Sequence, residues 1–298
     1  MAQQIQGQEK DLGGGFTVRR SLPHRDRRSV GPFVFFDHFG PVTLDPGPGH
    51  DVRPHPHIGL ATFTYLFDGA IQHRDSLGSV QRIEPGAVNW MSAGKGIVHS
   101  ERTPRDLLSA PSKRHGLQLW VALPEAEEAS APSFQHVAAA DIPQQAIEGA
   151  TVRVVVGTAH GATSPVRTLS EVLVLVYDMD VASGTEVEVP PLAAELALYA
   201  VDHPVEIDCE KVDEFRLAPL EPGRTHRLAA PRGGRIVLVG GEPLGHRHLA
   251  WNFVSSSLER IRAAEADWRA QRFPQVPGET DFIPLPEKPK APTFVAPN

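Results

Sequence analysis

The stretches PHPHIGLATFTYLFDG (residues 54–69) and GKGIVHSER (residues 94–102) decide the fold and the chemistry of this chain. Both have the pattern of a β-strand, and each carries polar side chains at positions i and i+2: His55 and His57 in the first, His99 and Glu101 in the second. Side chains alternate between the faces of a strand, so each pair points to one side. Two such strands paired across a barrel interior would bring three imidazoles and one carboxylate to a common point. This donor set suits a divalent first-row metal, and we predict a metal site at these four residues.

A lone H-x-H motif is also common at protein surfaces, and this chain contains 14 His. The letters around the first pair favour the metal, because they resemble the first signature of the cupin family, G-x5-H-x-H-x3,4-E-x6-G. Gly49, the two His and Gly69 match it, while Thr62 stands in the place of the Glu.

The second cupin signature, P-x-G-x2-H-x3-N, survives in part. Gly96 and His99 match it, whereas Gly94 replaces the Pro and Thr103 replaces the Asn. The carboxylate missing from the first signature is then supplied by Glu101.

Length and composition fit a globular protein with two cores. The chain has 298 residues, of which 41% are hydrophobic. No apolar stretch has the length of a membrane span, and the polar start MAQQIQGQEK lacks the hydrophobic region of a signal peptide, so we expect a cytoplasmic protein. The single cysteine, Cys209, excludes an internal disulfide, agrees with a reducing compartment and is expected in the core.

The net charge argues against direct binding of nucleic acid. A formal charge of -7 does not supply the basic surface that phosphate neutralisation needs. One basic run, RRSLPHRDRR, could contact an acidic partner or a phosphate, although a solvated turn is the plainer interpretation. Its cations are Arg19, Arg20, Arg25, Arg27 and Arg28.

Short runs of β-branched and aromatic residues, separated by Gly and Pro, predict an all-β fold of antiparallel strands. They lie at 33–41, 60–69, 116–124, 151–157, 173–181 and 234–241.

An internal repeat indicates two barrels in tandem. The string Tyr65-Leu-Phe-Asp-Gly leads to a Glu-Pro-Gly at Glu84, and Tyr199-Ala-Val-Asp-His leads to another at Glu221. The offsets that give the first His pair from Tyr65 give Val189 and Pro191 from Tyr199, so we expect the second barrel to lack metal ligands. The later pair His246 and His248 follows a Gly and has no downstream partner, which favours a surface turn.

Past residue 250 the pattern changes to helix. Ser256 and Glu259 predict a capping box, with Leu258, Ile261 and Trp268 on one apolar face. Seven Pro in the last twenty-five residues predict an extended tail that is passive or recruits a partner through P-x-x-P. The expected units are a metal-binding barrel at 1–128, a linker at 129–149, a barrel without metal at 150–245, and a helix with a Pro-rich tail at 246–298.

Taken together, these strings resemble the pirin family of bicupins. The resemblance is carried by FFDHFGP, PHPHIGL, TYLFDG, GKGIVHSE and GLQLWVALP, and continues through GEPLG and WNFVSSS. It implies a single metal, usually Fe(II) or Fe(III), held by His55, His57, His99 and Glu101 in the first barrel. One departure is Ile58, where the family often has a basic residue.

Two classes of function follow. Three neutral imidazoles and one carboxylate leave two open positions on an octahedral ion, unlike the closed, often thiolate-rich set of a structural zinc. Some pirins resemble quercetinases, which implies a quercetin 2,3-dioxygenase-type oxygenase that acts with Fe(2+) and O2 on a flavonol or similar enolisable phenol. Glu101 would be ligand and catalytic base, and Asp37, Gln118 and Trp90 are candidates to face the same cavity.

The alternative is a non-enzymatic redox or metal sensor that regulates transcription or a metabolic enzyme through a protein partner. The basic run between Arg19 and Arg28 would favour it. In either case we expect a monomer that binds neither membrane nor nucleic acid directly.

Overall fold

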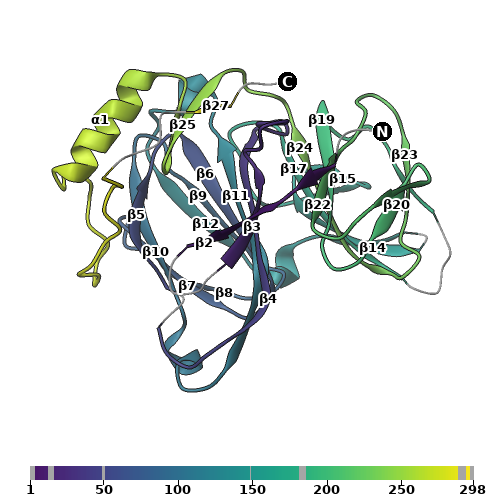
Figure 1. The fold of residues 1–298 in the computed structure, drawn as a ribbon, viewed down its shortest axis with the longest axis horizontal. Helices are drawn as coiled ribbons and strands as arrows, with labels where there is room; N and C mark the ends of the chain where they lie inside the picture. Colours follow the sequence, from purple (N-terminus) through teal and green to yellow (C-terminus); the bar gives the residue numbers. More distant parts are fainter. Residues whose placement is uncertain are drawn as a thin grey trace.

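Two antiparallel β-barrels stand side by side, and a single α-helix lies at the outer edge of the first (Figure 1). This computed structural model describes residues 4–12, 17–48, 51–147, 149–180, 186–287 and 293–295. Gly49 of the cupin signature falls outside these ranges. The predicted all-β bicupin class is confirmed.

The first barrel consists of a seven-stranded and a four-stranded antiparallel sheet. The larger sheet contains, in spatial order, β12 (Ser133–Val137), β9 (Val88–Ser92), β6 (Leu60–Asp68), β11 (Ser112–Ala122), β4 (Phe33–Leu44), β3 (Thr17–Leu22) and β2 (Gln8–Asp11). The smaller sheet contains β5 (Val52–His57), β10 (Ile97–Arg102), β7 (Ile71–Asp75) and β8 (Val80–Ile83).

The second barrel repeats this plan. Its larger sheet contains β1 (Ile5–Gln6), β22 (Arg216–Pro219), β19 (Glu195–Ala200), β24 (Gly234–Gly241), β17 (Val172–Met179), β14 (Ala150–Val156) and β13 (Gln144–Ile147). Its smaller sheet contains β18 (Val187–Val189), β23 (His226–Ala229), β20 (Val205–Ile207) and β21 (Glu210–Val212).

The remaining elements connect or cover the barrels. A small hairpin and a three-stranded sheet are formed by β15 (Thr158–Ala159), β16 (Ala162–Thr163), β25 (Arg247–Ala250), β26 (Phe253–Ser255) and β27 (Thr293–Val295). The helices are η1 (Arg105–Leu107), η2 (Glu125–Glu127), η3 (Ala139–Asp141) and α1 (Leu258–Arg269).

The two barrels share one hydrophobic core, which lies between their larger sheets. Because side chains alternate along a strand, Phe63 and Tyr65 of β6 point into this core together with Val174, Val176 and Tyr199 of the second barrel. The alternate residues of β17 and β19 point the other way, into the second barrel. The interface is therefore a sheet-on-sheet packing of apolar faces.

The internal repeat is visible in this arrangement, although its sequence register holds only in part. Tyr65 on β6 and Tyr199 on β19 occupy equivalent strands and both enter the shared core. The two Glu-Pro-Gly turns, however, are not equivalent. The turn at Glu84 precedes β9, whereas the turn at Glu221 follows β22, the counterpart of β9.

The interior of the second barrel is filled with aliphatic side chains. Val187 and Val189 of β18, the counterpart of β5, pack there against Leu198 and Leu228. The first barrel has buried His on the corresponding strands β5 and β10. The two interiors thus differ in donor chemistry and not in strand plan.

The stretch 129–149, expected as a linker, contributes a strand to each barrel. β12 pairs with β9 of the first barrel, and β13 pairs with β14 of the second. The domain limits themselves stay a prediction.

Two predictions about single residues are wrong. Cys209 is exposed instead of buried, because Asp208 and Cys209 form the two-residue turn between β20 and β21. Both have positive φ (51° and 65°), as a type I′ hairpin requires. His248 is buried on β25, so only His246 of that H-x-H is exposed.

The start of α1 also differs from the predicted capping box. Ser257 is the N-cap, and no side chain caps the backbone. Ser256 instead donates hydrogen bonds to the buried carboxylate of Glu128, through its backbone N–H at 2.8 Å and its hydroxyl at 3.2 Å. A buried carboxylate needs hydrogen-bond donors, and Ser256, the predicted cap, is one of them.

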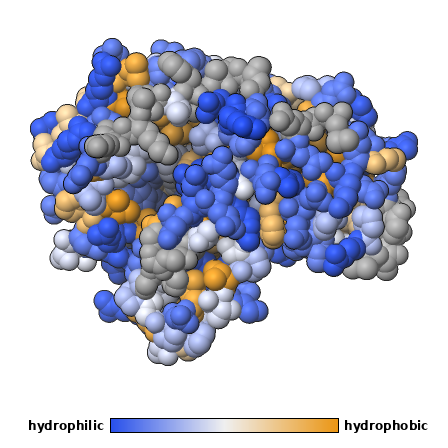
Figure 2. All heavy atoms as spheres, in the orientation of Figure 1, coloured by the Kyte–Doolittle hydropathy of each residue, from blue (hydrophilic) through white to orange (hydrophobic). Residues whose placement is uncertain are grey.

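The face seen in Figure 2 is largely hydrophilic, with apolar residues in small separate spots. Within the described ranges, no helix combines the length and the apolar character needed to cross a bilayer.

The shared core predicts where stability resides. Phe36 is fully buried in it, with its ring 4.7 Å from that of Tyr199. We expect Phe36→Ala to reduce the free energy of unfolding by about 3–5 kcal/mol. The partly exposed Phe282 is the matched control, and Phe282→Ala should cost about 1 kcal/mol or less. Denaturant titration followed by circular dichroism measures both, and equal losses would contradict the assignment of the core.

Candidate metal centre

Three of the four predicted ligands come together inside the first barrel. β5 and β10 pair so that His99 lies opposite His55, and His57 lies opposite Ile97. The ring centroids of the three His are 4.4–5.1 Å apart, and all three side chains are buried. One ring nitrogen from each lies within 4.8 Å of the others. Among the described residues, no other group of three or more His, Cys, Asp or Glu meets this criterion.

Backbone carbonyls fix the tautomers of the first two imidazoles. Nδ1 of His55 lies 2.9 Å from the carbonyl oxygen of Arg53, and Nδ1 of His57 lies 3.0 Å from that of Asn252. A carbonyl only accepts, so Nδ1 of each ring carries the proton and donates it. Nε2 of each ring is thereby left with a free lone pair.

The Nε2 atoms converge. Those of His57 and His99 are 3.1 Å apart. Two ligands about 2.1 Å from one metal and at right angles to each other are separated by about 3 Å. The spacing and the lone pairs therefore fit a divalent cation.

Burial keeps these imidazoles neutral. It lowers the pKa of His55 to about 4 and the pKa of His57 and His99 well below the usual value. Because a charged imidazole loses hydration on burial, the neutral form persists at pH 7. A neutral imidazole is the form that binds a metal.

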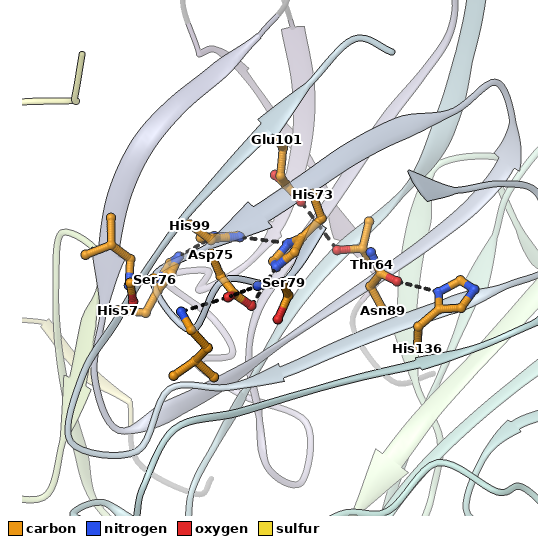
Figure 3. Close-up of polar contacts among 12 residues, drawn as sticks. His57, Thr64, His73, Asp75, Ser76, Ser79, Asn89, His99, Glu101 and His136 are labelled. Atoms are coloured by element: carbon orange, nitrogen blue, oxygen red, sulfur yellow. Dashed lines mark hydrogen bonds and ion pairs between the residues drawn. The ribbon is translucent and has the colours of Figure 1, made fainter. Parts of the chain in front are cut away.

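Glu101 stands beside the three-imidazole group and outside it. It follows His99 by two residues on β10, past an irregularity in the pairing with β5. Together with His55 and His57 it lines a cavity in the first barrel. Burial raises the pKa of this carboxyl, and the nearby His73, Arg114 and Thr64 partly offset that effect. The Thr64 hydroxyl lies 3.4 Å from its Oε1 (Figure 3). The ligand role predicted for Glu101, like that of the three His, stays a prediction.

A cavity of about 630 Å³ is lined by two of the three imidazoles, those of His55 and His57. Its wall carries a flat aromatic stack, in which the rings of Phe35 and Trp120 are 4.0 Å apart and nearly parallel. The Arg20 guanidinium lies over Phe35, and the Trp120 ring meets His57 edge-on at 5.1 Å. Residues from both ends of the chain complete the lining, among them Lys10, Asp11, Leu12, Trp251, Ile283 and Thr293.

Two of the three residues expected to face this cavity do so. Asp37 lines it and binds Arg20 through two hydrogen bonds of 2.8 and 2.7 Å. Gln118 lines it and accepts a hydrogen bond of 2.8 Å from Thr64. Trp90 points the other way, into the core between the barrels, so its predicted place is wrong.

Ile58 does not lie at the cavity rim. It is buried against Phe253 in a separate apolar cluster beneath α1. Ile58, where the family often has a basic residue, therefore contributes to apolar packing. It does not affect the charge of the cavity rim.

The basic run between residues 19 and 28 is mostly engaged within the molecule. Arg19 donates to the carbonyl of Gly40, and Arg27 lies 3.3 Å from the carboxylate of Glu195. Arg25 is the member that extends into solvent, with its side chain 83% exposed. Arg28 lines the cavity.

His73 and Asp75 on β7 also lie at this site, although they were not among the predicted site residues. Nδ1 of His73 lies 3.5 Å from Nδ1 of His99, and Nε2 of His73 lies 3.1 Å from a carboxylate oxygen of Asp75 (Figure 3). All three residues are buried. The signal was present as an H-x-D at i and i+2, which places both side chains on one face of a strand.

The sequence and the fold of this chain are similar to those of known proteins. The model of the family described as Pirin matches residues 15–121, and the Pirin C-terminal cupin domain matches residues 176–274. A pirin-like protein of Caulobacter vibrioides is 44% identical, with 93% of this chain and 96% of that protein covered. A Pseudomonas aeruginosa protein, named provisionally as a quercetin 2,3-dioxygenase, is 38% identical over 90% of this chain and 84% of its own length. The crystal structure of quercetin 2,3-dioxygenase from Acinetobacter baumannii superposes with a TM-score of 0.88 at 32% identity, covering 98% of this chain and 97% of that chain.

The difference between the two barrels predicts about one metal ion per chain. His57→Ala removes one of the converging Nε2 atoms and should abolish metal retention through gel filtration. His246→Ala, in the other H-x-H and exposed, should retain full occupancy. Elemental analysis of the purified variants measures both. Two tightly bound ions per chain, or full occupancy in His57→Ala, would refute this assignment.

Proposed function

The chain belongs to the pirin family of bicupins, and on that basis we propose that it is a metal-dependent oxygenase of the quercetin 2,3-dioxygenase type. Its substrates would be O2 and a flavonol or a similar enolisable phenol. The observation that carries the proposal is the group of three neutral imidazoles, two of which line a large cavity that also holds an aromatic stack. The names of the Pseudomonas and Acinetobacter proteins support the reaction type.

The residues that would hold the metal are His55, His57, His99 and Glu101. Imidazole and carboxylate ligands suit iron(II), which is our choice for the native ion, and the sole thiol, Cys209, lies on a hairpin of the second barrel. When bound, such an ion supplies Lewis-acid and one-electron redox chemistry at the cavity wall. Burial keeps the three imidazoles neutral, and backbone carbonyls orient two of them, His55 and His57.

The cavity would bind and orient a flat phenolic ring. Phe35 and Trp120 line the cavity next to His57, where their exposed ring atoms could contact a planar ring. Val18, Phe39 and Ile71 add apolar lining that would exclude water around the bound ring.

Glu101 would accept the substrate's hydroxyl proton. It lines the cavity two residues from His99, and burial raises the pKa of its carboxyl, which makes the carboxylate a better base than in water. The proton would go to one of the two carboxylate oxygens of Glu101. The Thr64 hydroxyl lies 3.4 Å from one of them, Oε1. The catalytic and ligand roles of this residue are both part of the proposal.

The sensor alternative gains little from the geometry. The basic run that would favour it is largely held by Asp37, Glu195 and a backbone carbonyl. A regulatory protein partner, a monomeric state and a cytoplasmic location stay predictions.

Anaerobic reconstitution with Fe(II), followed by measurement of O2 uptake with a panel of flavonols and enediols, tests the enzymatic role. We expect turnover with at least one flavonol. Tight iron binding without turnover on any member would move the assignment to the sensor.

Substitution of Glu101 separates a base from a ligand. Glu101→Gln keeps the three imidazoles and should retain part of the metal, while turnover per bound metal falls about 10²–10⁴-fold. His99→Ala should lose metal and turnover together. The measurement is turnover normalised to metal content, and a value near wild type in Glu101→Gln would exclude the base role.

A further inference from the structure

The third imidazole of the metal centre is held differently from the other two. Nδ1 of His55 and of His57 each faces a backbone carbonyl, whereas Nδ1 of His99 faces Nδ1 of His73 at 3.5 Å. Nε2 of His73 in turn faces Oδ2 of Asp75 at 3.1 Å. Figure 3 shows His57, His99, His73 and Asp75 following one another through the barrel interior. The last residue of this series, Asp75, has a fully buried carboxylate.

The tight turn after β7 fixes the orientation of Asp75. Its Oδ1 accepts hydrogen bonds from the backbone N–H groups of Leu77 at 2.9 Å and Ser79 at 3.0 Å. Only Oδ2 is directed at His73. His73 is held independently, because its ring stacks on Phe134 at 4.4 Å with a 15° interplanar angle.

These contacts determine where each proton lies. A carboxylate only accepts, so Nε2 of His73 carries a proton and donates it to Asp75. In neutral His73, Nδ1 then has a lone pair and accepts the Nδ1 proton of His99. Nε2 of His99 is consequently unprotonated and directed at the Nε2 of His57, 3.1 Å away.

We propose that Asp75 and His73 are positioning residues, which set the tautomer and ring orientation of His99 and thereby the affinity of the centre for metal. The inference rests on the proposed metal site. It assigns to a His–Asp pair the role that the carbonyls of Arg53 and Asn252 have for the other two imidazoles. Such partners of metal-bound His typically change metal affinity 10–100-fold.

A plainer interpretation is that Asp75 only shapes the turn between β7 and β8. The two backbone N–H groups of the turn use Oδ1 alone, however, and an Asn amide oxygen could accept from both. The second oxygen of the carboxylate is therefore the atom to test.

Asp75→Asn makes this test with little change of shape. Its amide oxygen must stay with the two turn N–H groups, so its NH2 group faces His73 and donates. His73 then accepts at Nε2 and carries its proton on Nδ1, which requires His99 to accept at Nδ1 and to be protonated at Nε2. The nitrogen that should bind the metal is blocked.

The second barrel offers a matched control. Asp208 accepts a backbone N–H from Arg227 through Oδ1 at 2.9 Å and faces Nδ1 of His226 through Oδ2 at 2.7 Å. Asp208→Asn thus makes the same change at a buried His far from the three-imidazole group in the fold.

Affinity for Co²⁺, measured by competition with a chromophoric chelator, should fall 10–100-fold in Asp75→Asn and stay unchanged in Asp208→Asn. His73→Phe keeps the stack on Phe134 and removes the acceptor, and it should weaken Co²⁺ binding in the same range. Thermal unfolding of each metal-free variant checks that the fold is intact, and His73→Phe decides the question if Asp75→Asn does not fold. The proposal would be overturned if Asp75→Asn and His73→Phe both bound Co²⁺ as tightly as the wild type. It would also be overturned if Asp208→Asn lost as much Co²⁺ affinity as Asp75→Asn.

Imidazole ¹⁵N spectra of the metal-free protein at pH 8 give a readout without metal. We expect His99 to be protonated at Nδ1 in the wild type and at Nε2 in Asp75→Asn, a change that a turn-forming role would not produce. An unchanged His99 tautomer would overturn the inference. A wild-type protein that binds no Co²⁺ would instead contradict the proposed metal site, while the spectra would still decide the roles of Asp75 and His73.

Discussion

The packing of the two seven-stranded sheets against each other is the constraint on which the site depends. This packing commits alternate residues of β4, β6 and β11 to the shared core, Phe36, Phe63 and Leu119 among them. The intervening residues on the same strands, such as Asp37, Gln118 and Trp120, must then face the first barrel's cavity. The second barrel thus acts as a support that fixes one wall of a site to which it contributes no His of the three-imidazole group.

Burial has opposite consequences in the two barrels. In the second, Val187, Val189 and Leu228 fill the interior and contribute apolar packing. In the first, the interior holds imidazoles whose protons are already committed to fixed acceptors, so their remaining lone pairs converge. Buried imidazole nitrogens whose lone pairs have no hydrogen-bond donor are costly to leave unsatisfied. The same lone pairs are well suited to binding a cation.

Much of this was predictable from the sequence, because period-two alternation and the H-x-H and H-x-E spacing are local properties. They placed His55, His57 and His99 in one group of converging imidazoles and Val189 in an apolar interior. Most of the errors arose where long-range contacts decide. Trp90 lies between two buried faces that alternation alone does not distinguish. Ser256, the serine expected to cap α1, donates instead to Glu128, which is over a hundred residues away in the sequence. Cys209 was misplaced because turn geometry outweighed its apolar character. His73 was missed because its partner His99 lies on a neighbouring strand.

A crystal structure of the iron-loaded protein, with anomalous scattering recorded at the iron absorption edge, tests the metal centre most directly. We predict one iron peak per chain, bound by Nε2 of His55, His57 and His99 and by a carboxylate oxygen of Glu101. Absence of a peak among the three imidazoles, or a peak of equal height inside the second barrel, would contradict the account.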